Sequence, residues 1–116
     1  MAENKLADLS MDFAIKILKT TDGIKGYYSL INQLERSATS IGANIREAKY
    51  AHSKADFISK LQIALKECYE TDYWPGLFKD TNMILEIEYR NMFAKCSKIR
   101  KLLIAAITTA KKNIQG

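Results

Sequence analysis

Residues that interrupt secondary structure are scarce in this chain, which has one proline and five glycines among its 116 residues. Sheets need frequent turns whereas long helices do not, so this scarcity favours an all-α fold. A chain of this length can build one hydrophobic core, and we expect residues 1–116 to form a single domain. Hydrophobic residues make up 47% and charged residues 27% of the chain, which is typical of a globular protein.

The first helical segment predicted by apolar periodicity runs from about residue 6 to residue 20. A stripe of large apolar side chains recurs at spacings of three and four, and Met11, Ile15 and Leu18 widen its apolar arc. The sequence Thr21-Asp22-Gly23 then supplies a stop, because glycine tolerates the left-handed conformation that ends helices.

The second segment runs from about Tyr27 to Tyr50 and has small side chains around Gly42. Glycine inside a helix costs about 1 kcal/mol relative to alanine. We interpret this point as a place where a neighbouring helix packs closely, rather than as a hinge.

The third segment begins near Ser53, a potential N-cap with an acidic residue three positions later. Pro75 lies late in this segment and has no backbone N–H, so we expect the helix to be kinked or broken there. The fourth segment begins between residues 83 and 88 and continues to about Asn113. Four amphipathic helices joined by short connections predict an up-and-down antiparallel four-helix bundle.

Positive charge is concentrated at the C-terminal end of the chain. Residues 1–50 carry seven Lys/Arg and six Asp/Glu, residues 51–90 carry five and seven, and residues 91–116 carry six and none. The balances of +1, −2 and +6 sum to the net charge of +5. A localised positive field can attract a polyanion, whereas a solvated charged surface that only keeps the protein soluble is the alternative. The candidate phosphate-binding residues are Lys95, Lys98, Arg100, Lys101, Lys111 and Lys112.

A second group of candidates consists of large apolar residues outside the inner stripes of the last two segments. Aromatic residues are enriched at the centres of subunit interfaces, so we favour an oligomer interface for at least part of this group. The alternative is that a kink at Pro75 turns some of them into the core of the monomer. The candidate interface residues are Tyr73, Trp74, Leu77, Phe93 and Ile104.

Catalytic and metal-binding patterns are absent from the sequence. The one histidine, His52, has no glutamate three residues before it, so the paired Glu-x-x-His motifs of a di-iron bundle are missing. Cys68 and Cys96 lie on core stripes and are interpreted as small packed hydrophobes. We therefore expect no enzyme activity, no metal and no cofactor.

Localisation is predicted from similar absences. No apolar run approaches the roughly 20 residues that cross a bilayer, and no secretory signal is visible. Two cysteines make no disulfide framework, which favours a reduced compartment. We expect a cytoplasmic protein that does not bind a membrane.

Asp72 falls on the inner stripe of the third segment. A buried carboxylate needs a partner, unless the kink at Pro75 carries it to the surface. Glu67 and Glu70 are candidates for ion pairs with arginines of the second segment.

Two stretches resemble a known bacterial family, the 23S rRNA-intervening-sequence proteins. They are residues 33–48, QLERSATSIGANIREA, and residues 53–74, SKADFISKLQIALKECYETDYW. Pro75 departs from the family pattern, in which an ordinary helix former is more usual. The resemblance implies an antiparallel four-helix bundle that assembles as a ring-shaped homopentamer. A similar group, the accessory variability determinants of diversity-generating retroelements, forms basic pentameric barrels that bind nucleic acid and a reverse transcriptase.

These observations give one leading functional hypothesis and one alternative. The leading hypothesis is a non-enzymatic, homo-oligomeric module whose basic surface binds RNA or DNA weakly and without sequence preference, and the resemblance implies that the oligomer is a pentamer. The alternative is a protein-interaction adaptor or scaffold that does not bind nucleic acid. A reverse transcriptase is one protein partner that the resemblance suggests.

Overall fold

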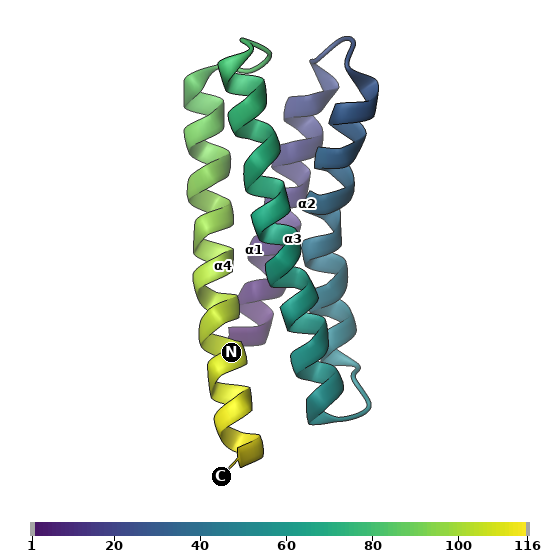
Figure 1. The fold of residues 1–116 in the computed structure, drawn as a ribbon, viewed down its shortest axis with the longest axis vertical. Coiled ribbons are helices and arrows are strands. Elements are labelled where there is room, and N and C mark those ends of the chain that lie inside the picture. The colour runs from purple at the N-terminus through teal and green to yellow at the C-terminus, as the bar shows by residue number, and fades with distance from the viewer. Residues whose placement is uncertain (1, 116) are drawn as a thin grey trace.

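The structure, a computed structural model, describes residues 2–115, and the side chains of residues 5–114 (Figure 1). Its four helices are α1 (Ala2–Asp22), α2 (Tyr28–Lys49), α3 (Lys54–Asp80) and α4 (Glu86–Gln115). Short connections join successive helices at alternate ends of a rod that measures 49 × 21 × 19 Å. The predicted all-α bundle is confirmed, and α1 extends past its predicted limits at both ends.

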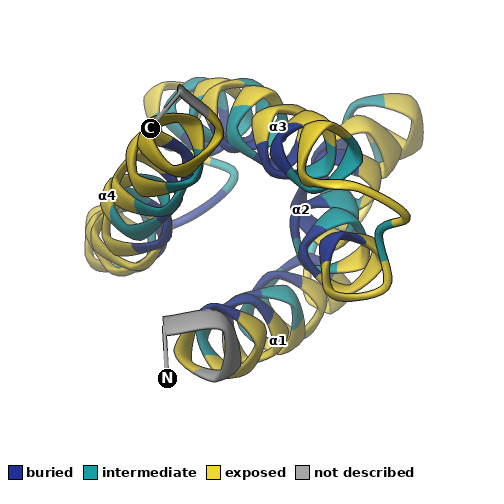
Figure 2. Ribbon diagram, turned by 90° about the horizontal axis from the view of Figure 1, so that it is seen from below, coloured by how far each residue is buried: buried dark blue, intermediate teal, exposed yellow. Residues whose placement is uncertain are grey.

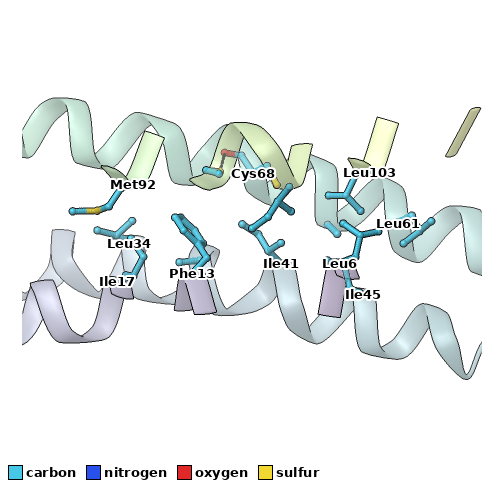
Figure 3. Packing of buried hydrophobic residues seen from close by; sticks show 14 of the residues in the cluster. Leu6, Phe13, Ile17, Leu34, Ile41, Ile45, Leu61, Cys68, Met92 and Leu103 are labelled. Carbon is cyan, nitrogen blue, oxygen red and sulfur yellow. Dashed lines mark hydrogen bonds between the residues drawn. The ribbon is translucent and has the colours of Figure 1, made fainter. Parts of the chain in front are cut away.

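The hydrophobic core runs the length of the bundle. Each helix packs against its neighbours in the sequence, and α4 also packs against α1, so the four helices enclose one apolar interior (Figure 2). Figure 3 shows side chains from all four helices meeting there. The largest fully buried apolar side chains include Phe13, Ile17, Leu34, Ile41, Phe78, Met92, Ile99 and Leu103.

The helix ends follow local hydrogen bonding. Ser53 caps α3 as predicted, because its Oγ accepts a hydrogen bond from the backbone N–H of Asp56 at 3.1 Å. The Asp56 carboxylate in turn accepts one from the backbone N–H of His52 at 3.3 Å. The predicted stop at Thr21-Asp22-Gly23 is confirmed, because α1 ends at Asp22, although Gly23 itself does not take the left-handed conformation. In the connection between α1 and α2, Gly26 and Tyr27 are left-handed, with φ of 86° and 53°, directly before α2.

Pro75 does not end α3, which is continuous from Lys54 to Asp80. The proline is buried, and the Thr71 hydroxyl, one turn earlier, donates to Ser37 Oγ of α2 at 2.9 Å. This buried bond ties α3 to α2 at the turn where the proline removes a backbone hydrogen bond. The helix was expected to be either broken or kinked at Pro75. The break is not observed, and the kink stays a prediction.

Gly42 marks a close approach between α2 and α1, which confirms the packing interpretation. A Cβ atom at this position would lie 3.1 Å from the Ser10 Oγ and 3.5 Å from the Ser10 Cβ. Ser10 is itself buried, and its hydroxyl donates to the Ala7 carbonyl at 3.0 Å. The missing side chain thus lets the two helices meet at Ser10.

We expect Gly42→Ala and Ser10→Ala to be coupled. Alanine at position 42 favours the helix by about 1 kcal/mol, but its methyl group crowds the Ser10 hydroxyl in the wild type. Ser10→Ala removes that hydroxyl, so the helix-favouring effect of alanine at position 42 should then appear. The free energy of unfolding of the double variant should exceed the value expected from adding the two single changes by about 0.5–1 kcal/mol. Urea denaturation of the four proteins in this cycle measures the coupling. Strict additivity would show that the two helices do not approach as closely as described.

Candidate nucleic-acid interface and apolar surfaces

Five lysines of α4 point away from the core and form the candidate phosphate-binding surface. Within residues 5–114, the ion pairs shorter than 4.0 Å involve none of their ammonium groups. The positions recur every three residues in the middle of the helix and return near its C-terminal end. We call them the α4 lysines: Lys95, Lys98, Lys101, Lys111 and Lys112, all exposed.

Arg100, the sixth predicted cation, does not belong to this surface. Its side chain is 19% exposed, and its Nη1 lies 2.5 Å from the Oδ2 of Asp72 on α3. Its Nη2 donates to Ser97 Oγ at 3.1 Å, and the guanidinium lies 5.6 Å from the centre of the Tyr69 ring. The prediction that Arg100 binds phosphate is therefore corrected: a neighbouring helix supplies the carboxylate that neutralises it.

Asp72 has the partner that its position on the inner stripe required. Burial raises the pKa of Asp72 above its ordinary value, while the Cys96 thiol and the Arg100 guanidinium oppose that shift. The Cys96 Sγ also lies 3.6 Å from the Cys68 carbonyl oxygen (Figure 3). A hydrogen bond to Cys68 and burial raise the pKa of Cys96, so its thiolate is disfavoured and the thiol is a packed, unreactive group.

Two cations between α2 and α3 are also neutralised. Arg36 Nη2 lies 3.5 Å from Glu70 Oε1, and Lys60 Nζ lies 3.6 Å from Glu47 Oε1. The pairing of Arg36 with Glu70 follows the predicted link between α2 and α3. Burial, more than the adjacent Glu70 charge, raises the pKa of Glu67. Other cations outside α4 have no ion pair within residues 5–114, Arg46 and Lys49 of α2 among them, but residues 91–116 carry six cations and no acid.

The candidate interface residues separate into two groups. Tyr73, Phe93 and Ile104 are 63%, 43% and 42% exposed. Trp74 instead packs against the core, with its ring edge-on to Tyr73 at 5.0 Å between ring centres. Leu77 is half-buried. The alternative interpretation thus holds for Trp74, because this part of α3 faces the core even without a break at Pro75.

Sequence reasoning missed a second exposed apolar surface on α1. Met11, Ile15 and Leu18 were expected to widen its core stripe, but they are 60%, 43% and 45% exposed. The signal was present in the sequence, because the core stripe of α1 is complete without these three residues. They add a further apolar row at spacings of four and three.

Metal-binding and membrane-spanning features were searched over the described residues. In that part of the chain, His, Cys, Asp and Glu side chains form no group of three that could hold a metal ion. No helix there is sufficiently long and apolar to span a membrane.

Comparison with known proteins identifies the family. The model of the 23S rRNA-intervening sequence protein family matches residues 2–105. This chain belongs to that family. A solved structure from Bacteroides thetaiotaomicron, described as a protein with unknown function from the S23 ribosomal protein family, is similar over the whole fold. It is 42% identical, the alignment covers 93% of this chain and 99% of that chain, and the TM-score is 0.87. No curated protein matches.

The residues matched by the family model include the exposed apolar residues but only part of the basic surface. The family match includes Lys95, Lys98 and Lys101, and it ends before Lys111 and Lys112. It also includes the exposed apolar residues of α1, α3 and α4 described above. The last turns of α4 are therefore the part of the basic surface that lies outside the matched region.

Proposed function

We propose that this protein is a non-enzymatic, cytoplasmic, homo-oligomeric module that binds RNA or DNA weakly through the α4 lysines. The observation that carries the proposal is the set of five exposed lysines with no carboxylate oxygen within 4.0 Å among residues 5–114. Lysine ammonium groups bind phosphates as point charges and release counterions when they do so. The expected binding is sensitive to salt and indifferent to sequence.

Oligomerisation strengthens the electrostatic argument. A single chain carries a net charge of +5, so the proposed pentamer would carry five times that, or +25. A ring would present the same lysines five times around one axis. Several weak contacts to one polyanion then act together, because each contact after the first is intramolecular. The exposed Tyr73, Phe93 and Ile104 support assembly, since large exposed apolar side chains gathered on one side mark interaction surfaces.

Reversing two of the α4 lysines tests the proposal. Lys95→Glu/Lys98→Glu should weaken binding to a structured RNA hairpin about tenfold or more at low salt, and should reduce the slope of log affinity against log salt by about one for each lost phosphate contact. The matched control is Lys19→Glu/Lys25→Glu, which changes the net charge by the same amount. Lys19 lies in the last turn of α1 and Lys25 in the connection after it, and both are exposed. Fluorescence anisotropy measures both affinities.

The control variant separates local contact from total charge. If the proposal is right, Lys19→Glu/Lys25→Glu binds more tightly than Lys95→Glu/Lys98→Glu, and both have the wild-type mass in light scattering. Equal losses in the two variants would show that only the overall charge matters. No loss in either would remove the α4 lysines from the proposal.

A protein-interaction adaptor is the second candidate function, and one end of the bundle favours it. The α1–α2 and α3–α4 connections lie at the same end (Figure 1). They place Tyr27, Tyr28, Leu85 and Ile87 there, each between 65% and 68% exposed. A protein partner such as a reverse transcriptase would bind this end. Capture that persists after nuclease treatment and with Lys95→Glu/Lys98→Glu, but is lost with Leu85→Glu, would support the adaptor.

A further inference from the structure

A hollow of about 810 Å³ lies partly inside the bundle and is lined by side chains from all four helices. Tyr50 and Phe57 line it next to the connection between α2 and α3. From there it continues into the groove between α1 and α2, where Leu18 and Thr39 line its other end. Small-molecule sites in proteins have volumes of about 300–1,000 Å³, so the hollow has the size of a ligand site.

The hollow exists because the helices end at different levels and because many of its lining residues are small. Figure 1 shows that α1 begins short of the end at which α2 joins α3, whereas α4 extends beyond that end. The last turns of α4 therefore face α2 and α3 across the place that α1 occupies elsewhere in the bundle. The small residues that line the hollow include Ala7, Gly42, Ala43, Ala105, Ala106 and Ala110.

The floor of the hollow is apolar. Leu6, Ile45 and Leu61 meet at one end of the core, and all three line the hollow (Figure 3). Phe57 and Leu102 line it too, and they pack against the core while remaining only partly buried. An apolar ligand in the hollow would remove more of their surface from water, which is favourable.

Two cations stand at the edge of the hollow without a carboxylate partner. Arg46 and Lys49 are three residues apart on α2, line the hollow and are exposed. Among the side chains of residues 5–114, no carboxylate oxygen lies within 4.0 Å of either, and no Asp or Glu lines the hollow. Glu47 lies between them in the sequence, but its carboxylate is 3.6 Å from Lys60 on α3. The charge at this edge is therefore complementary to an anion.

We propose that the hollow binds a long-chain fatty acid. The occupant must combine one anionic group with a flexible apolar chain, because the lining carries its charge at one edge and is mostly apolar elsewhere. The carboxylate lies between Arg46 and Lys49, since a guanidinium can donate two parallel hydrogen bonds to a carboxylate. The alkyl chain lies against Ile45, Leu61 and Leu102. None of the α4 lysines lines the hollow, so this site is separate from the proposed nucleic-acid surface.

The apolar part of the site is tested with decanoate, dodecanoate and tetradecanoate, each below its micelle concentration. Each added pair of CH₂ groups should tighten binding to the wild-type protein about tenfold while the chain stays in the hollow. Ala110→Phe places a ring in the hollow and should abolish measurable binding of tetradecanoate. Isothermal titration calorimetry measures the affinities, and circular dichroism confirms that the variant keeps its helices.

The charged part of the site is tested with Arg46→Gln/Lys49→Gln. This variant should bind dodecanoate about tenfold more weakly than the wild type does, because a charge-assisted hydrogen bond is lost. Its affinity for dodecanol should be unchanged, since the alcohol carries no charge. The matched control is Lys19→Gln/Lys25→Gln, which removes two exposed lysines that do not line the hollow and should keep the wild-type affinity for both ligands.

Four results would overturn the fatty-acid site. They are equal losses of dodecanoate affinity in the two double variants, equal losses for dodecanoate and dodecanol in Arg46→Gln/Lys49→Gln, an affinity that does not change with chain length, and binding to phosphatidylglycerol vesicles without binding to monomeric dodecanoate. The titration with the RNA hairpin is a separate result. RNA binding without fatty-acid binding would overturn only this site, and fatty-acid binding without RNA binding would overturn only the proposed nucleic-acid function.

Discussion

Replacing Phe13 with alanine is expected to lower the free energy of unfolding by about 3–5 kcal/mol. The Phe13 ring is 1% exposed and lies among core side chains of the other helices (Figure 3). Truncation to a methyl group removes buried apolar area and leaves a cavity that closely packed neighbours fill only in part. The change should weaken the packing of α1 most, because Phe13 belongs to the buried row that holds α1 against the other helices. Urea denaturation followed by circular dichroism measures the change.

Tyr28→Ala is the control for this prediction. Tyr28 is also aromatic, but it is 68% exposed and lies at the start of α2, outside the core. Its replacement should change the unfolding free energy by no more than about 0.5 kcal/mol. The proteins are compared at one concentration, because association adds to apparent stability. Similar losses for Phe13→Ala and Tyr28→Ala would contradict the described core.

Arg100→Leu is expected to cost about 2–4 kcal/mol at neutral pH, because it leaves the Asp72 carboxylate without its partner. The Asp72 side chain is 17% exposed, so water solvates the orphaned charge poorly. Leucine keeps much of the apolar stem that Arg100 buries, and the loss therefore reports the charge rather than the volume. Adding Asp72→Leu should recover more than half of the lost stability. No recovery would show that the ion pair is not what Arg100 contributes.

The pH dependence of the unfolding free energy of Arg100→Leu is a second test of the ion pair between Arg100 and Asp72. Burial already raises the pKa of Asp72 in the folded protein, and removing the guanidinium removes a group that opposes the shift. The folded variant then binds a proton at Asp72 more tightly than the unfolded chain does. Stability therefore falls as pH rises from the ordinary aspartate pKa through the raised one. The deficit of Arg100→Leu relative to wild type should be smaller at acidic pH than at neutral pH, and a constant deficit would contradict the assignment.

The four helices and their inner stripes could be predicted from the sequence because burial in a bundle follows the helical period. Cys68 and Cys96 were placed in the core by that period alone, and both are buried. The N-cap at Ser53 was also predictable, since it depends on a contact three residues away. Such features need no knowledge of which helix lies beside which.

The surfaces were harder to predict because they depend on neighbouring helices. A count of cations placed Arg100 among the phosphate-binding residues, and only the position of Asp72 on the adjacent helix removes it. The stripe of α1 did not reveal that Ile15 would be exposed, since the width of a buried face depends on how the next helix crosses it. Trp74 could not be placed while the course of α3 beyond Pro75 was open.

The central claim is that the α4 lysines form an unneutralised surface that binds phosphates. The most direct measurement is the affinity of the wild-type protein for a structured RNA hairpin between about 50 and 200 mM salt. The account predicts binding at the lowest salt and a linear fall of log affinity with log salt, with a slope of at least about two in magnitude. Absence of binding at the lowest salt, or an affinity that salt does not change, would contradict it.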